Sequence, residues 1–147
     1  MLSIKIREAN FEDAEVISRL STQLGYPASE MDIQNNLLDI TSTKLGNVFV
    51  AISENTVTGW IYLYRHTDLS TGRYMEIMGL VVDEAHRSKG IGAQLIQYTI
   101  NICKKENIKQ LVLRSRVTRA SAHRFYRNLG FVEIKEQKVF SYDFNKY

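Results

Sequence analysis

The chain has 147 residues, of which 44% are hydrophobic and 24% charged, and its net charge is +3 with eight glycines and one proline. This composition is typical of one globular domain, which we expect to span residues 1–147, and it excludes collagen-like and broadly disordered chains. The single Cys103 excludes a disulfide framework, and no apolar run reaches the roughly 18 residues of a membrane span. A signal-peptide pattern is also absent, so we expect a cytoplasmic protein.

The first half of the sequence predicts a strand, two helices and a hairpin. Apolar and polar residues alternate in the first strand, and side-chain caps with glycine stops delimit the helices. The turn Glu54-Asn55 joins the two strands of the hairpin. The segments are a strand at residues 2–7, a helix from Asn10 to Gly25, a helix capped by Ser29, and strands at 47–53 and 56–64.

The second half alternates strands with helices. The segments are a strongly apolar strand at 74–83, a long helix at 90–107, a strand at 110–115, a short helix at 119–129, and closing strands at 131–134 and 138–144. The order of elements predicts an α/β (α+β) fold. We expect a single domain with a mixed, mostly antiparallel sheet of about seven strands flanked by about four helices.

Charge is unevenly distributed along the chain. Residues 1–83 carry six Lys and Arg against eleven Asp and Glu, whereas residues 84–147 carry thirteen against five. An anionic partner would therefore meet the second half, and nucleic acid, an acidic membrane surface and a phosphorylated cofactor are the candidates. A solvated basic face without a partner is the alternative.

A loop with two glycines joins the apolar strand directly to the long helix. The first amides of a helix have no intrahelical acceptor, and the helix dipole favours an anion there. Gly90 and Gly92 would allow close approach of a ligand, and Arg87 and Lys89 add positive charge. A dinucleotide-binding fingerprint would need glycine at Leu95, and a P-loop would need a Gly-Lys-Ser/Thr run, so both are excluded. A glycine-rich turn without a ligand is the alternative.

Two blocks of sequence carry a resemblance to the GNAT superfamily of N-acetyltransferases. The first is Arg87-x-x-Gly90-x-Gly92, and the second is the run from Ser121 to Phe131, SAHRFYRNLGF. A softer match, Ile6-Arg7-Glu8-Ala9 followed by Asp13, extends the resemblance over essentially the whole chain. The C-terminal half is also similar to aminoalkylphosphonate N-acetyltransferases.

The resemblance implies acetyl-CoA as co-substrate and no required metal. Backbone amides of the loop would hold the pyrophosphate, and the apolar strand would pair with the pantetheine arm as an added strand does. Arg119 stands where the family often has asparagine, and it would instead meet a phosphate. The implied cofactor-binding residues are Leu80, Val81, Val82, Arg87, Ser88, Lys89, Gly90, Ile91, Gly92, Ala93, Arg119 and Tyr126.

Acetyl transfer to an amine needs a base and an acid. The resemblance implies that Tyr126 is the acid near the CoA sulfur. The alternative is that Tyr126 is an aromatic residue of the core. Glu76 is the candidate base, because a carboxylate is unexpected in an apolar strand. The alternative is that Glu76 lies at an open strand end and bonds to a neighbouring residue. By simple alternation Glu76 would share a face with Met78 and Leu80.

Several other side chains have a purely structural interpretation as well as a functional one. His66 and His86 lack a partner at the spacing of metal ligands, so no metal site is predicted. Cys103 falls on the inward stripe of the long helix. The alternating aromatic residues Trp60, Tyr62 and Tyr64 would either line an acceptor pocket or pack under a helix.

The sequence thus predicts an enzyme that transfers acetyl to a primary amine of a small molecule or peptide by direct attack in a ternary complex. The resemblance implies that residues 24–39 and 66–73 would shape the acceptor pocket, for a cationic amine or a small zwitterion. A catalytically silent acyl-CoA sensor is one alternative. Another is a nucleic-acid-binding domain using Arg114, Arg116, Arg119, Arg124 and Arg127. A membrane partner is not expected, and a homodimer is left open.

Overall fold

The computed structural model describes residues 3–145, which divide into two compact units at the boundary between Arg114 and Ser115. The first unit contains a five-stranded sheet with helices on both faces. Its elements are β1 (Lys5–Glu8), the 3₁₀ turn η1 (Phe11–Asp13), α1 (Ala14–Leu24), α2 (Glu30–Thr43), β2 (Gly46–Ser53), β3 (Thr56–Asp68), β4 (Gly72–Val82), η2 (Glu84–His86), α3 (Ile91–Lys105) and β5 (Leu111–Leu113). The second unit contains α4 (Ala120–Asn128).

The sheet follows the chain, in the order β1-β2-β3-β4-β5. The first four strands are antiparallel neighbours, and β4 and β5 are parallel, with α3 as the crossover between them. The expected mixed, mostly antiparallel sheet is therefore confirmed. The turn between β2 and β3 lies at Glu54 and Asn55, which both have positive φ, at 53° and 61°, as a tight hairpin turn requires.

Local capping explains where the helices begin and end. Asn10 and Asp13 form the predicted capping box before α1, and Gly25 ends that helix with a left-handed φ of 97°. The side chain of Ser29 accepts a hydrogen bond from the amide of Asp32 and caps α2.

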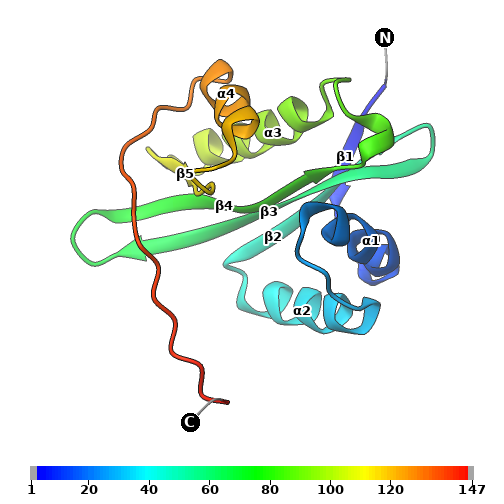
Figure 1. The fold of residues 1–147 in the computed structure, drawn as a ribbon, viewed down its shortest axis with the longest axis horizontal. Coiled ribbons are helices and arrows are strands. Elements are labelled where there is room, and N and C mark those ends of the chain that lie inside the picture. Colours follow the sequence, from blue (N-terminus) through cyan, green and yellow to red (C-terminus); the bar gives the residue numbers. More distant parts are fainter. Residues whose placement is uncertain (1–2, 146–147) are drawn as a thin grey trace. The chain divides into compact units, whose positions relative to one another are not determined.

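Apolar side chains bury both faces of the sheet. Figure 1 shows α1 and α2 covering one face and α3 the opposite face. Under α1 and α2, the cluster of Ile17, Val48 and Val50 packs with Trp60 and Tyr62. On the α3 face, Phe49 meets Tyr98 edge to face, with ring centroids 4.9 Å apart.

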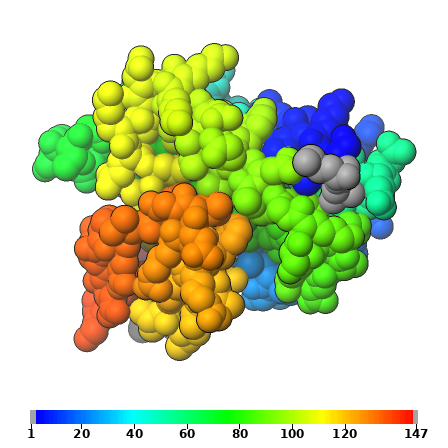
Figure 2. Space-filling model, turned by 90° about the horizontal axis from the view of Figure 1, so that it is seen from above, coloured from blue at the N-terminus to red at the C-terminus, as the bar shows by residue number. Residues whose placement is uncertain are grey.

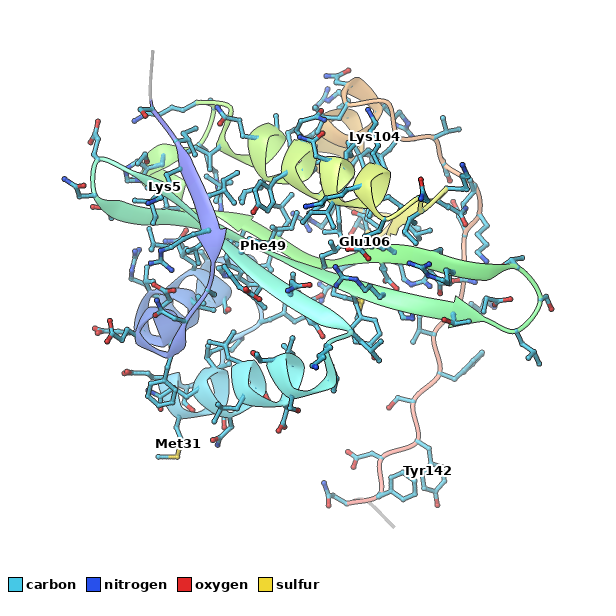
Figure 3. All side chains as sticks on the ribbon, turned by 180° about the vertical axis from the view of Figure 1, so that it is seen from behind. Lys5, Met31, Phe49, Lys104, Glu106 and Tyr142 are labelled. Carbon is cyan, nitrogen blue, oxygen red and sulfur yellow. The ribbon has the colours of Figure 1, made fainter. Side chains whose placement is uncertain are left out.

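An ion pair ties β3 to the end of α3. The guanidinium of Arg65 donates two hydrogen bonds to the carboxylate of Glu106, at 3.0 and 2.6 Å, and a third to Asn47 Oδ1 at 2.6 Å. The Arg65 bond lowers the pKa of Glu106 below its ordinary value, although burial opposes the effect. Figure 3 shows Glu106 where α3 ends, above the sheet.

Two of the expected strands are wrong. Residues 131–134 and 138–144 form no strand, so the described sheet has five strands and not about seven. Apart from the half-buried Phe131, their apolar side chains are exposed, from 64% at Ile134 to 89% at Phe140. Alternation specifies which face a strand would bury, but a strand forms only where it also finds a pairing partner. Leu2 of the expected first strand lies outside the described residues.

Candidate active site

The first turn of α3 presents backbone amides that no side chain caps. Gly90 is the N-cap residue, with a left-handed φ of 81°, and Ser88 also has positive φ, at 64°. Residues 87–90 are exposed, and Figure 2 shows this bright green segment at the surface. The predicted anion-binding residues from Ser88 to Ala93 therefore lie at an accessible helix N-terminus.

Arg87 is held at the end of β4 and not at the helix itself. Its Nε donates to the carbonyl oxygen of Val82 at 3.2 Å. The guanidinium therefore carries its charge beside the strand end from which the loop leaves.

Asp83 anchors the loop to α1. Its carboxylate accepts from Arg19 and Gln23, each at 3.3 Å, and from the amide of Ala85 at 3.3 Å, while Gln23 Oε1 accepts from the amide of Glu84 at 3.0 Å. Burial would raise the pKa of Asp83, but these bonds outweigh it and hold the pKa below its ordinary value. Sequence patterns give no signal for this anchor, because its partners lie about 60 residues away along the chain.

The edge of β4 next to the loop has a strand partner on one side only. β5 pairs with β4 at Met75, Glu76 and Ile77 and goes no further. Beyond that point Leu80, Val81 and Val82 pair with β3. Among residues 3–145, no strand pairs with the opposite edge of this part of β4. An extended ligand with amide groups would find backbone partners there.

A β-bulge at Met78 changes the predicted facing of β4. Tyr62 pairs with Gly79 and Leu63 with Ile77, so Met78 is the extra residue. Directly paired residues share a face, and Glu76, paired with Tyr64, therefore shares its face with Gly79 and Val81. The expectation that Glu76 shares a face with Leu80 is therefore wrong, and the unpaired Met78 is assigned to neither face by the pairing. A Cβ at Gly79 would lie 2.8 Å from the Trp60 ring, so glycine lets this indole pack against the bulge.

Glu76 is buried within a cluster of polar side chains. One carboxylate oxygen lies 2.9 Å from His66 Nε2 and the other 3.2 Å from Arg114 Nε. The side chain of Glu76 is 7% exposed, whereas those of His66 and Arg114 are 28% and 52% exposed. The sequence identified Glu76, but it placed His66 only in a loop expected to shape the acceptor pocket, because it predicts a strand that ends at Tyr64 whereas β3 runs to Asp68.

The alternating aromatic residues of β3, Trp60, Tyr62 and Tyr64, form a row whose members differ in their surroundings. Trp60 and Tyr62 pack under α1 and α2 against the core cluster. Tyr64 lies beside His66, with ring centroids 4.8 Å apart, and His66 stacks on Tyr74 at 4.8 Å with an interplanar angle of 14°. The row thus leads from the core to the polar cluster around Glu76.

The second unit carries the remaining predicted residues. Arg119 is the N-cap residue of α4, and Tyr126 lies in the same helix between the rings of Phe125 and Phe131, at 5.5 and 6.1 Å. Burial raises the pKa of the Tyr126 hydroxyl, and Arg119 partly offsets this. The hydroxyl therefore keeps its proton at neutral pH and is able to donate it.

Within residues 3–145, no three His, Cys, Asp or Glu side chains gather as metal ligands. No helix of the same residues is long and apolar enough to span a membrane.

Comparison with known proteins gives one family. A family model described as the acetyltransferase (GNAT) family matches residues 11–131. N-alpha-acetyltransferase 30 of Xenopus laevis is 36% identical over 66 residues, and the uncharacterized N-acetyltransferase YhdJ of Bacillus subtilis is 28% identical over 135 residues. The alignment with YhdJ covers 89% of this chain and 90% of YhdJ. The first curated relatives are longer, and the matches span 18–29% of their length and 45–60% of this chain.

Solved structures share the fold along the chain. A GNAT family acetyltransferase of Staphylococcus aureus superposes with a TM-score of 0.80 at 26% identity, covering 95% of this chain and 99% of that one. An aminoglycoside N-acetyltransferase, AAC(6')-Iy, in complex with CoA superposes with a TM-score of 0.83 at 18% identity, covering 98% and 97%.

Proposed function

The chain belongs to the acetyltransferase (GNAT) family, and from that premise we propose that it transfers an acetyl group from acetyl-CoA to a primary amine by direct attack in a ternary complex. The single observation that carries the proposal is that β4 continues past its last pairing with β5 into a loop and the uncapped N-terminus of α3. This arrangement offers backbone partners for an extended amide chain beside amides for a diphosphate.

The residues present fit CoA group by group. Amides from Ser88 to Ala93 would bind the pyrophosphate, with Arg87 and Lys89 supplying positive charge at the same place. The backbone of Leu80, Val81 and Val82 would bind the pantetheine arm. Arg119, at the start of α4, would meet a phosphate. The AAC(6')-Iy structure, which contains CoA, supports this ligand for the fold.

Two side chains would carry the proton transfers. Glu76 would be the base for the ammonium, directly or through an intervening group, and Tyr126 would donate a proton to the departing CoA thiolate. The amine nitrogen bonds to the acetyl carbon, and the C–S electron pair leaves on sulfur. No covalent acyl-enzyme is needed, and the one cysteine of the chain, Cys103, is buried.

For the acceptor we propose two classes of primary amine. The acidic first 83 residues favour a cationic amine of a small molecule or peptide, and the similarity of the C-terminal half to aminoalkylphosphonate enzymes favours a small zwitterion. The curated relatives are named for different acceptors, so the class must come from assay.

The test is calorimetry with acetyl-CoA followed by a thiol-release assay against polyamines, aminoglycosides, peptide N-termini and aminoalkylphosphonates. We expect acetyl-CoA binding and CoA release with one class. Binding without release for every amine would instead favour an acyl-CoA sensor. Salt-sensitive binding to nucleic acid without affinity for acetyl-CoA would contradict the proposal altogether.

A further inference from the structure

The buried carboxylate of Glu76 is not placed to meet an amine itself. Its side chain is 7% exposed, and both oxygens are engaged, one by His66 and the other by Arg114. An ammonium approaching from solvent would reach the partners of this carboxylate first. The group that touches the acceptor is therefore more exposed than Glu76.

His66 is such a group. Its side chain is 28% exposed, and Nε2 lies 2.9 Å from Glu76 Oε1. A carboxylate only accepts hydrogen bonds, so the ring proton belongs on Nε2 and the lone pair on Nδ1. Within the part of the chain that the structure describes, Nδ1 has no hydrogen-bond partner.

The imidazole is held in one orientation from three sides. Tyr74 of β4 stacks on its face, Tyr64 of β3 lies against it at 56°, and Glu76 fixes its Nε2 edge. Arg114, which follows β5, binds the far oxygen of Glu76 at 3.2 Å and so helps to fix the carboxylate behind the ring. A ring oriented by a carboxylate behind it is the arrangement that serves general-base histidines.

We propose that His66 is the catalytic base of the acetyl transfer and that Glu76 is its positioning residue. This inference rests on the proposed function. Nδ1 takes one proton from the ammonium, the freed amine attacks the acetyl carbon, and the C–S bond breaks. The departing thiolate takes the proton of the Tyr126 hydroxyl, the second proton lost by the nitrogen restores that hydroxyl, and the His66 proton returns to solvent. Glu76 holds Nε2–H throughout and stabilises the imidazolium that forms.

The first experiment needs no acceptor. Long-range ¹H–¹⁵N spectra of the full chain report the tautomer of each imidazole, and H86Q and H123Q assign the other two of the three histidines. We expect neutral His66 to carry its proton on Nε2, because the Glu76 carboxylate accepts from that nitrogen. A proton on Nδ1 overturns the proposal even if the enzyme is active.

The second experiment measures rate. In H66Q the side-chain amide keeps a donor toward Glu76 but supplies no base, so kcat/KM should fall by about 100-fold near neutral pH and recover as pH rises. The acetyl-CoA Kd should not change. H123Q is the matched control, because His123 Nε2 lies 2.8 Å from a backbone oxygen, that of Arg116, and His123 has no role in the proposed chemistry.

The outcomes separate the two proposals. A wild-type rate and pH profile in H66Q, or an acetyl-CoA affinity that falls in step with the rate, would overturn the role of His66. If the wild-type protein transfers acetyl to no amine, the proposed function fails, while the spectra still decide whether the histidine is arranged as inferred.

Discussion

The ring of Tyr126 packs with the rings of Phe125 and Phe131, and burial raises the pKa of its hydroxyl, so the hydroxyl is protonated at neutral pH. Tyr126→Phe keeps the ring and removes only the donor. We expect kcat to fall by about 100-fold, within the usual range for acid–base catalysis. Steady-state kinetics on the acceptor found by the panel would measure this change.

Two control measurements on the Tyr126→Phe variant are its affinity for acetyl-CoA and its thermal stability. The acetyl-CoA Kd and the Tm should stay close to wild type, because the packing against Phe125 and Phe131 is retained. A variant that loses stability together with activity would mean that the hydroxyl serves the local packing and not the thiolate.

Removing the charge of Glu76 should impair proton removal without affecting the cofactor. For Glu76→Gln we expect turnover near pH 7 to fall by about 100-fold and the acetyl-CoA Kd to stay within about twofold. The defect should shrink as pH rises, since more amine is then neutral before it binds. A pH–rate profile parallel to wild type would mean that Glu76 does not assist proton removal.

At the residue scale the sequence predicted the identity of the candidate residues better than their surroundings. A carboxylate in an apolar strand and a tyrosine in a helical block stand out from composition alone. The contact of Glu76 with His66 depends on β3 running on to Asp68, and the face of Glu76 depends on the bulge at Met78. Both are properties of strand pairing, which residue patterns do not encode.

The N-terminus of α3 allows a test that separates binding from folding. Gly92 is the second residue of this helix, where a negative charge is favourable to the helix dipole but repels a diphosphate. Gly92→Asp should therefore fold with a Tm near wild type while its acetyl-CoA Kd rises by about 100-fold or more. Calorimetry and thermal melting measure the two effects separately.

Gln97→Asp is the matched control for that helix. It adds the same charge to an exposed position about two turns from the N-terminus, and its acetyl-CoA Kd should stay within about threefold of wild type. An equal loss of affinity in both variants would mean that overall charge, and not the first turn, governs binding.

The link from β3 to α3 predicts how stability depends on pH. Arg65 holds the pKa of Glu106 below its ordinary 4.5, so this contribution is present above pH 4.5 and is lost as pH falls through the lower folded value. Arg65→Met should lower stability at pH 7 by about 1 kcal/mol, or roughly 3 °C in Tm. The difference from wild type should narrow by pH 3, and a constant difference across this range would contradict the assignment.

For the whole molecule, the sequence predicted the order of helices and strands through α4, with boundaries displaced by a few residues. Alternation and turn residues specified the hairpin of β2 and β3, and capping residues specified α1 and α2. The same alternation predicted strands at 131–134 and 138–144 that do not form. Local patterns describe what a segment can bury, and the partner that would bury it lies elsewhere in the chain.

Because the only thiol of the chain is buried, the rate at which it is labelled reports how often the core opens. Cys103 is 6% exposed, its sulfur lies 3.5 Å from that of Met75, and burial raises its pKa. A thiol-labelling reagent can therefore react only during moments when the core opens. The ratio of the labelling rate of the unfolded chain to that of the folded protein then gives the free energy of opening. If opening releases acetyl-CoA, the bound ligand should slow labelling further by the factor 1 + [L]/Kd, where [L] is the free acetyl-CoA concentration.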